Sequence, residues 1–150
     1  MTVIIMRGVP GSGKSTYAKA SFPGAVICSA DDFFTKDGVY RFDGAKIGMA
    51  HAECFSKFMR AITAPLELQI IIDNTNTQLW EMAPYRAVAH HFGHGVRIIR
   101  MACDPEIAAS RCVHDVPWNS VMNMQSRMEN TPSFWGGEEV VRNSVVSGIP

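Results

Sequence analysis

The sequence predicts an α/β fold in which helices cover both faces of a parallel sheet, and three observations point to it. Short runs of apolar, β-branched residues alternate with longer segments of helical periodicity. Such runs are typical of strands that are buried on both faces, as they are in parallel sheets. A glycine-rich segment, residues 8–13, joins the first run to the first helical segment. Together these features indicate repeated strand–helix–strand units in a three-layer sandwich.

The elements of the first half follow from periodicity and from residues that interrupt it. The first helix opens at the glycine-rich segment and ends before Pro23, because proline lacks the amide that continues a helix. The second apolar run leads into a polar stretch with the turn signal Asp37-Gly38. The long segment after it places Ile47 and Phe58 on one helical face. The expected elements are a strand at 2–6, a helix at 14–21, a strand at 25–28, a loop at 29–43 and a helix at 45–62.

The second half repeats this alternation. An isoleucine-rich strand ends in a polar cluster that begins at Asp73. Pro84, near the start of the next helical segment, predicts a kink or a boundary there. Asp104-Pro105 opens a further helix, and Pro117 interrupts the pattern before it resumes. The expected elements are a strand at 68–72, a helix at 79–92, a strand at 95–101 and helices at 106–112 and 120–127.

Composition is typical of one globular domain and excludes several classes of protein. The 150 residues are 47% hydrophobic and 19% charged, and 14 Lys and Arg balance 14 Asp and Glu. This neutrality excludes nucleic-acid binding through bulk positive charge but allows a local basic cleft. No apolar run reaches the roughly 20 residues of a membrane-spanning helix, and the four cysteines form no CxxC pair. We therefore expect one cytoplasmic domain, 1–150, with reduced thiols and no membrane partner.

The glycine-rich segment fits a phosphate-binding loop. Residues 8–15 read GVPGSGKS, which matches the pattern G-x-x-x-x-G-K-[ST] between a strand and a helix. Glycine permits positive φ, so that backbone amides can approach phosphates at the start of the helix. Lys14 is expected to contact the β- and γ-phosphates of ATP, and the Ser15 hydroxyl to bind Mg²⁺. The predicted nucleotide-binding residues are Gly11, Ser12, Gly13, Lys14, Ser15 and Thr16.

Two acidic sites follow predicted strands, at the sheet edge where α/β proteins bind ligands. Asp73 ends the isoleucine run and resembles a Walker B carboxylate that holds Mg²⁺, with helix capping as the alternative. Asp31 and Asp32 follow the second strand, and neighbours in an extended segment point to opposite sides. One of them is therefore expected to face the phosphates, where it can accept a proton from an attacking hydroxyl. The alternative is an acid pair exposed to solvent.

Three motifs together resemble the 5′-hydroxyl polynucleotide kinase branch of the P-loop kinases. They are GVPGSGKST at 8–16, SADDF at 29–33 and IIIDNTNT at 70–77. The resemblance covers roughly residues 2–128 and implies a sheet of about four strands in the order 2-3-1-4, with a helical lid at 111–128. It also implies that Asp31 is the general base and that Arg111 contacts the transferring phosphate. The polar cluster at 73–76 then supports the metal, the nucleotide and the base.

The predicted reaction is Mg²⁺-dependent transfer of the γ-phosphoryl group of ATP to a hydroxyl, with Lys14, Asp31 and Arg111 as catalytic residues. The resemblance implies the 5′-hydroxyl end of DNA or RNA as the acceptor. The family often places arginines beside the Asp-Asp pair, where this chain has Ala30 and Phe34. Two alternatives stay open: a kinase for a small hydroxyl acceptor, and a regulatory nucleotide-binding module with negligible transfer. Oligomeric state and the structure of 130–150 are not predicted.

Other residues have both a functional and an ordinary interpretation. Arg111 can be a surface arginine near a helix C-terminus, where cations are favoured. Lys36, Arg41 and Lys46 surround the acidic loop, where they either contact a substrate phosphate or belong to a solvated surface. The histidines between 90 and 94 lack neighbouring Cys or acid ligands, so a zinc site is not expected there.

Overall fold

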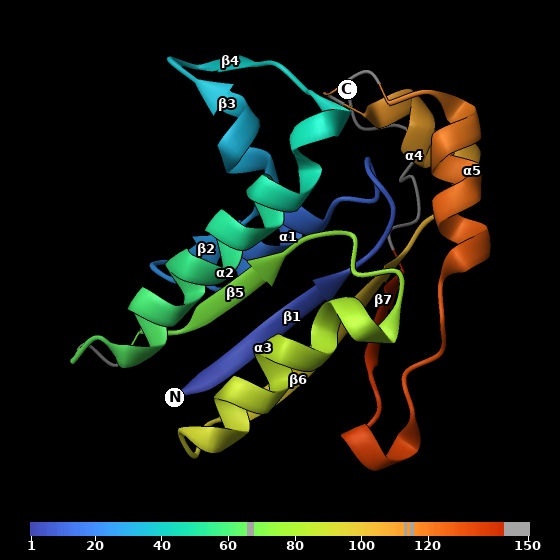
Figure 1. Ribbon diagram of the computed structural model, residues 1–150. Helices are drawn as coiled ribbons and strands as arrows, with labels where there is room; N and C mark the ends of the chain where they lie inside the picture. Colours follow the sequence, from blue (N-terminus) through green and yellow to red (C-terminus); the bar gives the residue numbers. More distant parts are fainter. Residues whose placement is uncertain (66–67, 113, 115, 143–150) are drawn as a thin grey trace.

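A parallel sheet forms the centre of the computed structural model, which describes residues 1–65, 68–112, 114 and 116–142 (Figure 1). Within these residues the sheet has five strands in the order β2-β5-β1-β6-β7. The α/β class and the order predicted for four strands are confirmed, and β7 is added at the edge. The strands are β1 (Thr2–Arg7), β2 (Val26–Cys28), β5 (Ile70–Asp73), β6 (Gly95–Ala102) and β7 (Glu139–Arg142).

Helices cover both faces of this sheet, and a small hairpin projects from one end of it (Figure 1). The hairpin consists of β3 (Thr35–Lys36) and β4 (Val39–Tyr40), paired antiparallel. Short 3₁₀ helices occur at Ala30–Phe34, Gly44–Lys46 and Ser133–Trp135. The α-helices are α1 (Lys14–Ser21), α2 (Ile47–Thr63), α3 (Leu79–His91), α4 (Pro105–Arg111) and α5 (Trp118–Arg127).

The core is divided by the sheet, as alternation along β1 requires. Val3 and Ile5 pack on the side of α2 and α3, whereas Ile4 and Met6 pack on the side of α1. All four side chains are fully buried. Burying an aliphatic side chain of this size contributes about 1.5–3 kcal/mol, so this central strand is a rigid support for the loop that follows it.

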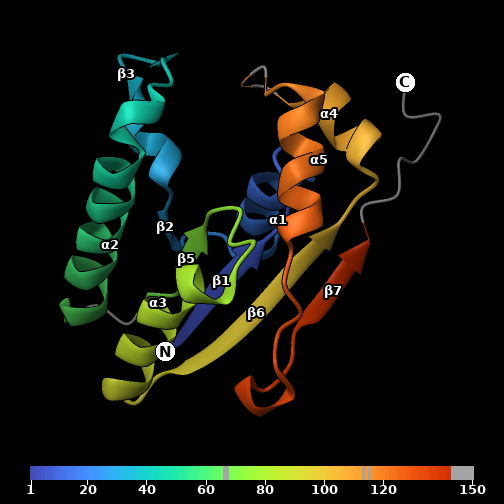
Figure 2. The same cartoon turned by 45° about the vertical axis from the view of Figure 1, so that its right-hand side comes forward.

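The lid forms a third packed region, beside the phosphate-binding loop. Ala108 of α4 and Val121 of α5 are fully buried against Val9 of that loop. Figure 2 shows α4 and α5 together above the ends of β6 and β7. Residues 113 and 115 of the predicted lid lie outside the described residues, as do residues 143–150 of the C-terminal segment.

Pro84 does not end the predicted helix, which continues through it to His91. Proline supplies no amide for the helical bond to the carbonyl of Trp80, which is exposed near the start of α3, so that carbonyl can bind water instead. The start is stabilised by a capping box, in which Glu81 accepts the amide of Gln78 at 2.9 Å. A boundary at Pro84 was therefore a wrong expectation.

The stretch predicted as a loop contains regular structure. Ser29 caps the 3₁₀ helix Ala30–Phe34 by accepting the amide of Asp31. The expected turn at Asp37-Gly38 is confirmed and joins β3 to β4, with φ of 53° and 75°. These angles suit a two-residue hairpin turn. Strands of two residues are too short to produce a visible period, so the hairpin was missed.

The described helices include none that is long and apolar enough to cross a membrane. All four cysteines are free thiols, with Cys28 and Cys54 buried in the core. Burial raises the pKa of the Cys28 thiol to about 12, so this group stays neutral and packs as an apolar residue.

Candidate active site

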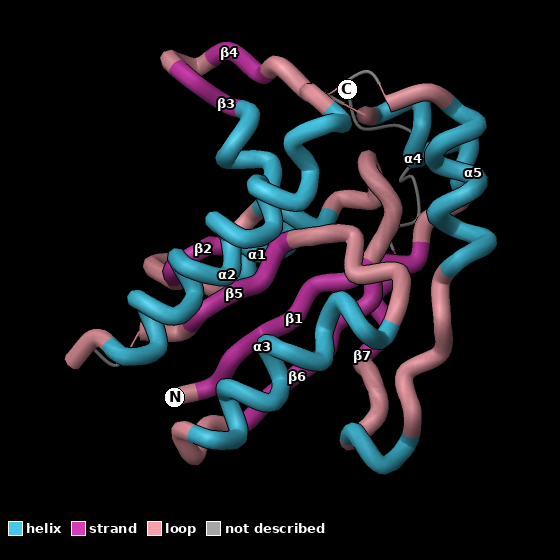
Figure 3. Tube along the Cα trace, viewed as in Figure 1, coloured by secondary structure: helices cyan, strands magenta, loops and turns pink. Residues whose placement is uncertain are grey.

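A cleft of about 910 Å³ lies at the carboxyl ends of the parallel strands. The loops after β1 and β5 meet there, where the Gly8 amide donates to the Thr75 carbonyl at 3.0 Å (Figure 3). Residues from the segment after β2 and from the lid complete the walls. The sequence-predicted residues that line it are Gly11, Gly13, Lys14, Ser15, Thr16, Asp31, Asp73 and Arg111.

Ser12 is the one predicted nucleotide-binding residue that does not line this cleft. It is fully buried beneath the loop, and its amide donates to the Val9 carbonyl at 3.1 Å. The structure therefore places Ser12 inside the loop, where it closes a turn, rather than on the surface that faces the cleft.

The glycines of the loop are required by conformation and by close packing. Gly13 begins α1 in the left-handed region, with φ of 94°. A Cβ on Gly8 would lie 2.7 Å from the Ser12 hydroxyl, and one on Gly11 would lie 1.8 Å from the Ala108 carbonyl oxygen. The loop backbone at Gly11 therefore packs directly against α4, and Gly11 and Gly13 present no side chain to the cleft that they line. A bare, helix-starting loop of this kind is suited to phosphate oxygens.

Replacing Gly11 with Ala should destabilise the protein and remove its stabilisation by ATP. The left-handed backbone alone costs about 1–2 kcal/mol for alanine, and displacing α4 should cost roughly 1–3 kcal/mol more. Thermal denaturation with and without ATP measures both effects. Gly24→Ala is the matched control, because Gly24 has the same φ of 82° and nothing within 4 Å of the added Cβ. An equal loss of thermal stability in Gly11→Ala and Gly24→Ala would contradict a contact between Gly11 and α4.

Lys14 lies over the loop and beside two carboxylates. Its ammonium donates to the Val9 carbonyl at 3.3 Å. Burial lowers the pKa of the Lys14 amine, and the negative charges of Asp73 and Asp31 partly oppose this. Phosphate oxygens in the cleft would favour the charged form further. Binding of phosphate in the cleft would therefore stabilise the protonated, positively charged form of Lys14.

Ser15 and Asp73 form a pair of oxygen donors at the start of α1. The Ser15 hydroxyl donates to Asp73 Oδ2 at 2.6 Å. The other carboxylate oxygen of Asp73, Oδ1, is buried and has no hydrogen-bond partner among the described residues. Mg²⁺ takes oxygen ligands and usually binds through one or two protein groups together with substrate phosphates. The donor set therefore fits Mg²⁺, and the described residues contain no cluster of three or more His, Cys, Asp or Glu suited to another metal.

Of the two neighbouring acids, Asp31 lines the cleft and Asp32 does not. Asp31 lies on the 3₁₀ helix whose first amide, that of Ala30, donates to Asn74 Oδ1 at 2.8 Å. Asp32 points elsewhere, with its carboxylate 3.7 Å from the Lys57 ammonium. Buried Asn74 thus fixes the backbone next to Asp31. The resemblance to polynucleotide kinases implies such a support of Asp31 by the polar cluster at 73–76.

Two further residues contact the Asp31 carboxylate: Tyr40, which the sequence did not indicate, and His114, for which the sequence left open a role as a second donor in the lid or an exposed loop position. The Tyr40 hydroxyl donates to Oδ1 at 3.4 Å, and His114 Nε2 lies 3.8 Å from Oδ2. The two rings stack with centroids 3.8 Å apart. Burial and the Asp31 charge raise the pKa of Tyr40 to about 12, so this hydroxyl remains a neutral donor. The hairpin and the lid therefore meet at Asp31.

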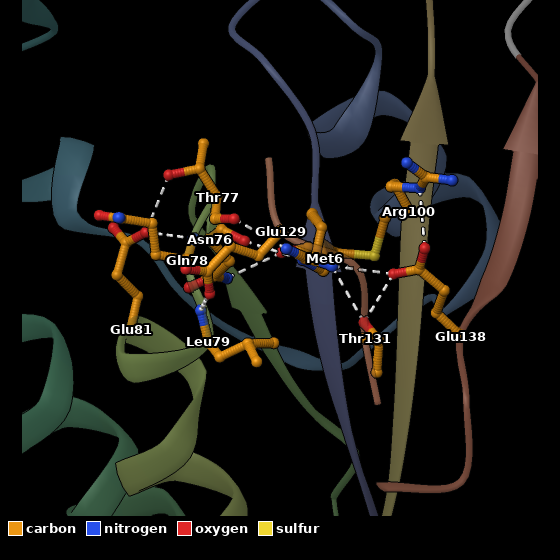
Figure 4. A network of polar contacts seen from close by, with 11 residues as sticks. Met6, Asn76, Thr77, Gln78, Leu79, Glu81, Arg100, Glu129, Thr131 and Glu138 are labelled. Carbon is orange, nitrogen blue, oxygen red and sulfur yellow. Dashed lines mark hydrogen bonds and ion pairs between the residues drawn. The ribbon is translucent and has the colours of Figure 1, made fainter. Parts of the chain in front are cut away.

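A buried arginine fixes the polar loop after β5. Arg7 is fully buried, and its guanidinium donates to the carbonyls of Asn76 at 2.8 Å and Thr77 at 2.9 Å. It also donates to Glu138 Oε2 and to the Thr131 hydroxyl, both at 2.9 Å. Burial lowers the pKa of Arg7, and the bond to Glu138 partly opposes this. Figure 4 shows how the residues of this loop and of the C-terminal segment converge on one network.

Comparisons with known proteins give one family and several related folds. Residues 3–129 match a family model described as an AAA domain. NEDD4-binding protein 2 of Homo sapiens is 35% identical over 133 residues, covering 83% of the chain but 7% of that protein's own length. The crystal structure of a gluconokinase from Sinorhizobium meliloti is similar in fold, with a TM-score of 0.61 and 15% sequence identity. The similarity covers 94% of this chain and 82% of the gluconokinase chain. Chaetomium thermophilum Kti12 in complex with ADP-AlF₃ is also similar in fold, with a TM-score of 0.67 and 13% sequence identity. The similarity covers 95% of this chain and 89% of the Kti12 chain.

Proposed function

Because the chain belongs to the AAA-domain family and has a P-loop kinase fold, we propose that it transfers the γ-phosphoryl group of ATP to a hydroxyl acceptor. One observation carries this proposal. A single cleft contains the phosphate-binding loop, a pair of oxygen donors for Mg²⁺ and an accessible carboxylate, Asp31. Binding of ATP alone would need the first two, whereas Asp31 supplies the carboxylate that an acceptor hydroxyl needs as a base.

The proposed step is an in-line displacement at the γ-phosphorus. The acceptor oxygen forms the new bond to phosphorus and gives its proton to the Asp31 carboxylate, while the bond to the bridging oxygen breaks and ADP leaves. Lys14 and the loop amides stabilise the negative charge on the phosphates, and Arg111 approaches it from the lid. Ser15 and Asp73 would hold Mg²⁺, which supplies further positive charge to the phosphates when bound.

The favoured acceptor is the 5′-hydroxyl end of DNA or RNA. Support comes from the three motifs at 8–16, 29–33 and 70–77, and from Asp31, which lines the cleft and is exposed. A small hydroxyl acceptor is the second candidate, since Ala30 and Phe34 stand where nucleic-acid-binding arginines are frequent. The similar gluconokinase is by name a kinase of a small molecule. We also propose a reducing compartment such as the cytoplasm, because all four cysteines are free.

Incubation with labelled ATP, Mg²⁺ and competing acceptors tests this proposal. We expect label on the 5′ end of a 5′-hydroxyl oligonucleotide and none on the same oligonucleotide carrying a 5′-phosphate. Label only on members of a panel of nucleosides, sugars and alcohols would contradict the nucleic-acid acceptor. ATP binding without acceptor-dependent release of ADP would instead support a regulatory module.

A further inference from the structure

A second cavity, of about 520 Å³, lies between the β3–β4 hairpin and the 3₁₀ helices Ala30–Phe34 and Gly44–Lys46 on either side of it. It is separate from the glycine-rich loop, and no step of the proposed reaction uses its residues. Three cations line it, Lys36, Arg41 and Lys46, together with the aromatic ring of Phe42. We define these four residues as the hairpin site.

The cations of the hairpin site have no side-chain partner within the part of the chain that the structure describes. Among the described residues, no ion pair or hydrogen bond engages the side chains of Lys36, Arg41 or Lys46. Two acids also line the cavity and offset part of its positive charge; one of them, Asp43, accepts the Ala45 amide at 3.0 Å and caps the short 3₁₀ helix after it. The other, Asp37, lies in the hairpin turn with φ of 53°. Unpaired cations around a cavity provide contacts for an anionic ligand.

The hairpin site adjoins the cleft that holds the candidate base. Phe42 lines both cavities. Tyr40, two residues earlier, lines the cleft and donates to the Asp31 carboxylate. A ligand whose hydroxyl lies at Asp31 can therefore extend past Tyr40 and Phe42 toward the cations. Such a ligand needs length and regularly spaced negative charge.

Phe42 has the geometry of a stacking platform. Phe42 is 60% exposed, so one face of its ring is open to solvent. Its ring lies 5.1 Å from the ring of buried Phe34, which holds it in place. Base stacking on exposed aromatic rings, combined with a few cations on the backbone phosphates, is the common way in which proteins bind single strands without sequence preference.

We propose that the hairpin site binds the acceptor strand beyond its 5′-terminal nucleotide, with Lys36, Arg41 and Lys46 on its phosphates and Phe42 stacked on a base. This inference rests on the proposed function and names its substrate class as single-stranded polynucleotide. A small hydroxyl acceptor would fill the cleft at Asp31 without reaching the hairpin site. Three cations also provide local attraction in a chain whose net charge is zero.

Fluorescence anisotropy with a 5′-hydroxyl hexanucleotide labelled at its 3′ end tests the hairpin site. Lys36→Glu, Arg41→Glu and Lys46→Glu should each weaken binding by about fivefold to tenfold and lower the salt slope by about 0.7 per lost phosphate contact. Phe42→Ala should weaken binding by about fivefold or more. Arg60→Glu is the matched control, because exposed Arg60 lies at the far end of α2 and lines neither cavity. ATP affinity and thermal stability should be unchanged in Arg60→Glu and in the three charge-reversal variants, which alter residues outside the lining of the cleft.

The outcomes separate this inference from the proposed function. If the protein phosphorylates the hexanucleotide but the charge reversals leave its affinity unchanged, the hairpin site is wrong and the kinase activity stands. If the reversals weaken binding but no phosphate is transferred to the hexanucleotide, the hairpin site stands and the proposed acceptor is wrong. Competition by poly-glutamate as strong as that by the hexanucleotide would overturn the assignment to nucleic acid.

Discussion

An Asp31→Asn variant should transfer phosphate about 10²–10⁴-fold more slowly than the unchanged protein, with almost the same affinity for ATP. The amide has the shape of the carboxylate but cannot take up the proton of the acceptor hydroxyl. Its Oδ1 can still accept the Tyr40 hydroxyl, which lies 3.4 Å away, so the hairpin should keep its position. Single-turnover formation of ADP in the presence of acceptor measures transfer, and titration with a fluorescent ATP analogue measures affinity.

Asp32→Asn provides the control for this substitution. Asp32 neighbours Asp31 in the chain but pairs with Lys57 and does not line the cleft. Its loss should change transfer by less than about threefold, since exposed ion pairs contribute little. A larger loss in Asp32→Asn than in Asp31→Asn would exchange the two roles. Unchanged transfer in both variants would show that neither carboxylate is the base.

Replacing Arg7 with Met should lower the free energy of unfolding by about 3–5 kcal/mol, because one partner of a buried ion pair is removed. Methionine fills a similar volume but leaves the Asn76 and Thr77 carbonyls without their donor. Glu138, whose side chain is only 12% exposed, keeps Arg100 at 2.9 Å but loses its buried partner. Urea denaturation monitored by circular dichroism measures the loss.

Arg97→Met is the matched control for this second prediction. Arg97 also lies on a strand of the sheet and pairs with Glu139 at 2.8 Å, but both side chains are about half exposed. Its removal should cost about 0–1 kcal/mol. If the two variants were equally stable, Arg7 would not be the residue that holds the loop after β5. Reduced transfer by Arg7→Met at temperatures where it remains folded would link that loop to the position of Asp31.

The inner strands could be predicted because burial on both faces leaves a continuous apolar signal. Residues 3–6 and 70–72 are buried without interruption, and their sequences are correspondingly apolar. Edge strand β7 reads EVVR and is largely exposed, so it resembles any surface segment. The hairpin strands, of two residues each, are shorter than one period of alternation. The signal therefore fades toward the edges of the fold.

The candidate site divides in the same way between local and long-range features. Lys14 and Ser15 belong to a motif within one short segment, and Asp73 follows directly from its strand. Arg7, by contrast, gains its role from Glu138, 131 positions away in the chain. The contact between Tyr40 and His114 likewise joins the hairpin to the lid. No local pattern specifies such pairs, because they depend on how separate elements pack.

The bond from Arg7 to Glu138 also has a consequence for the order of folding. It connects the first strand of the chain to the segment just before β7, across 131 positions. Contacts of such high sequence separation form late, because closing the intervening chain costs entropy first. During synthesis the loop at 76–77 therefore cannot reach its final geometry until residue 138 has left the ribosome. The site beside that loop should mature late, so that a nascent chain binds nucleotide only after β7 has docked.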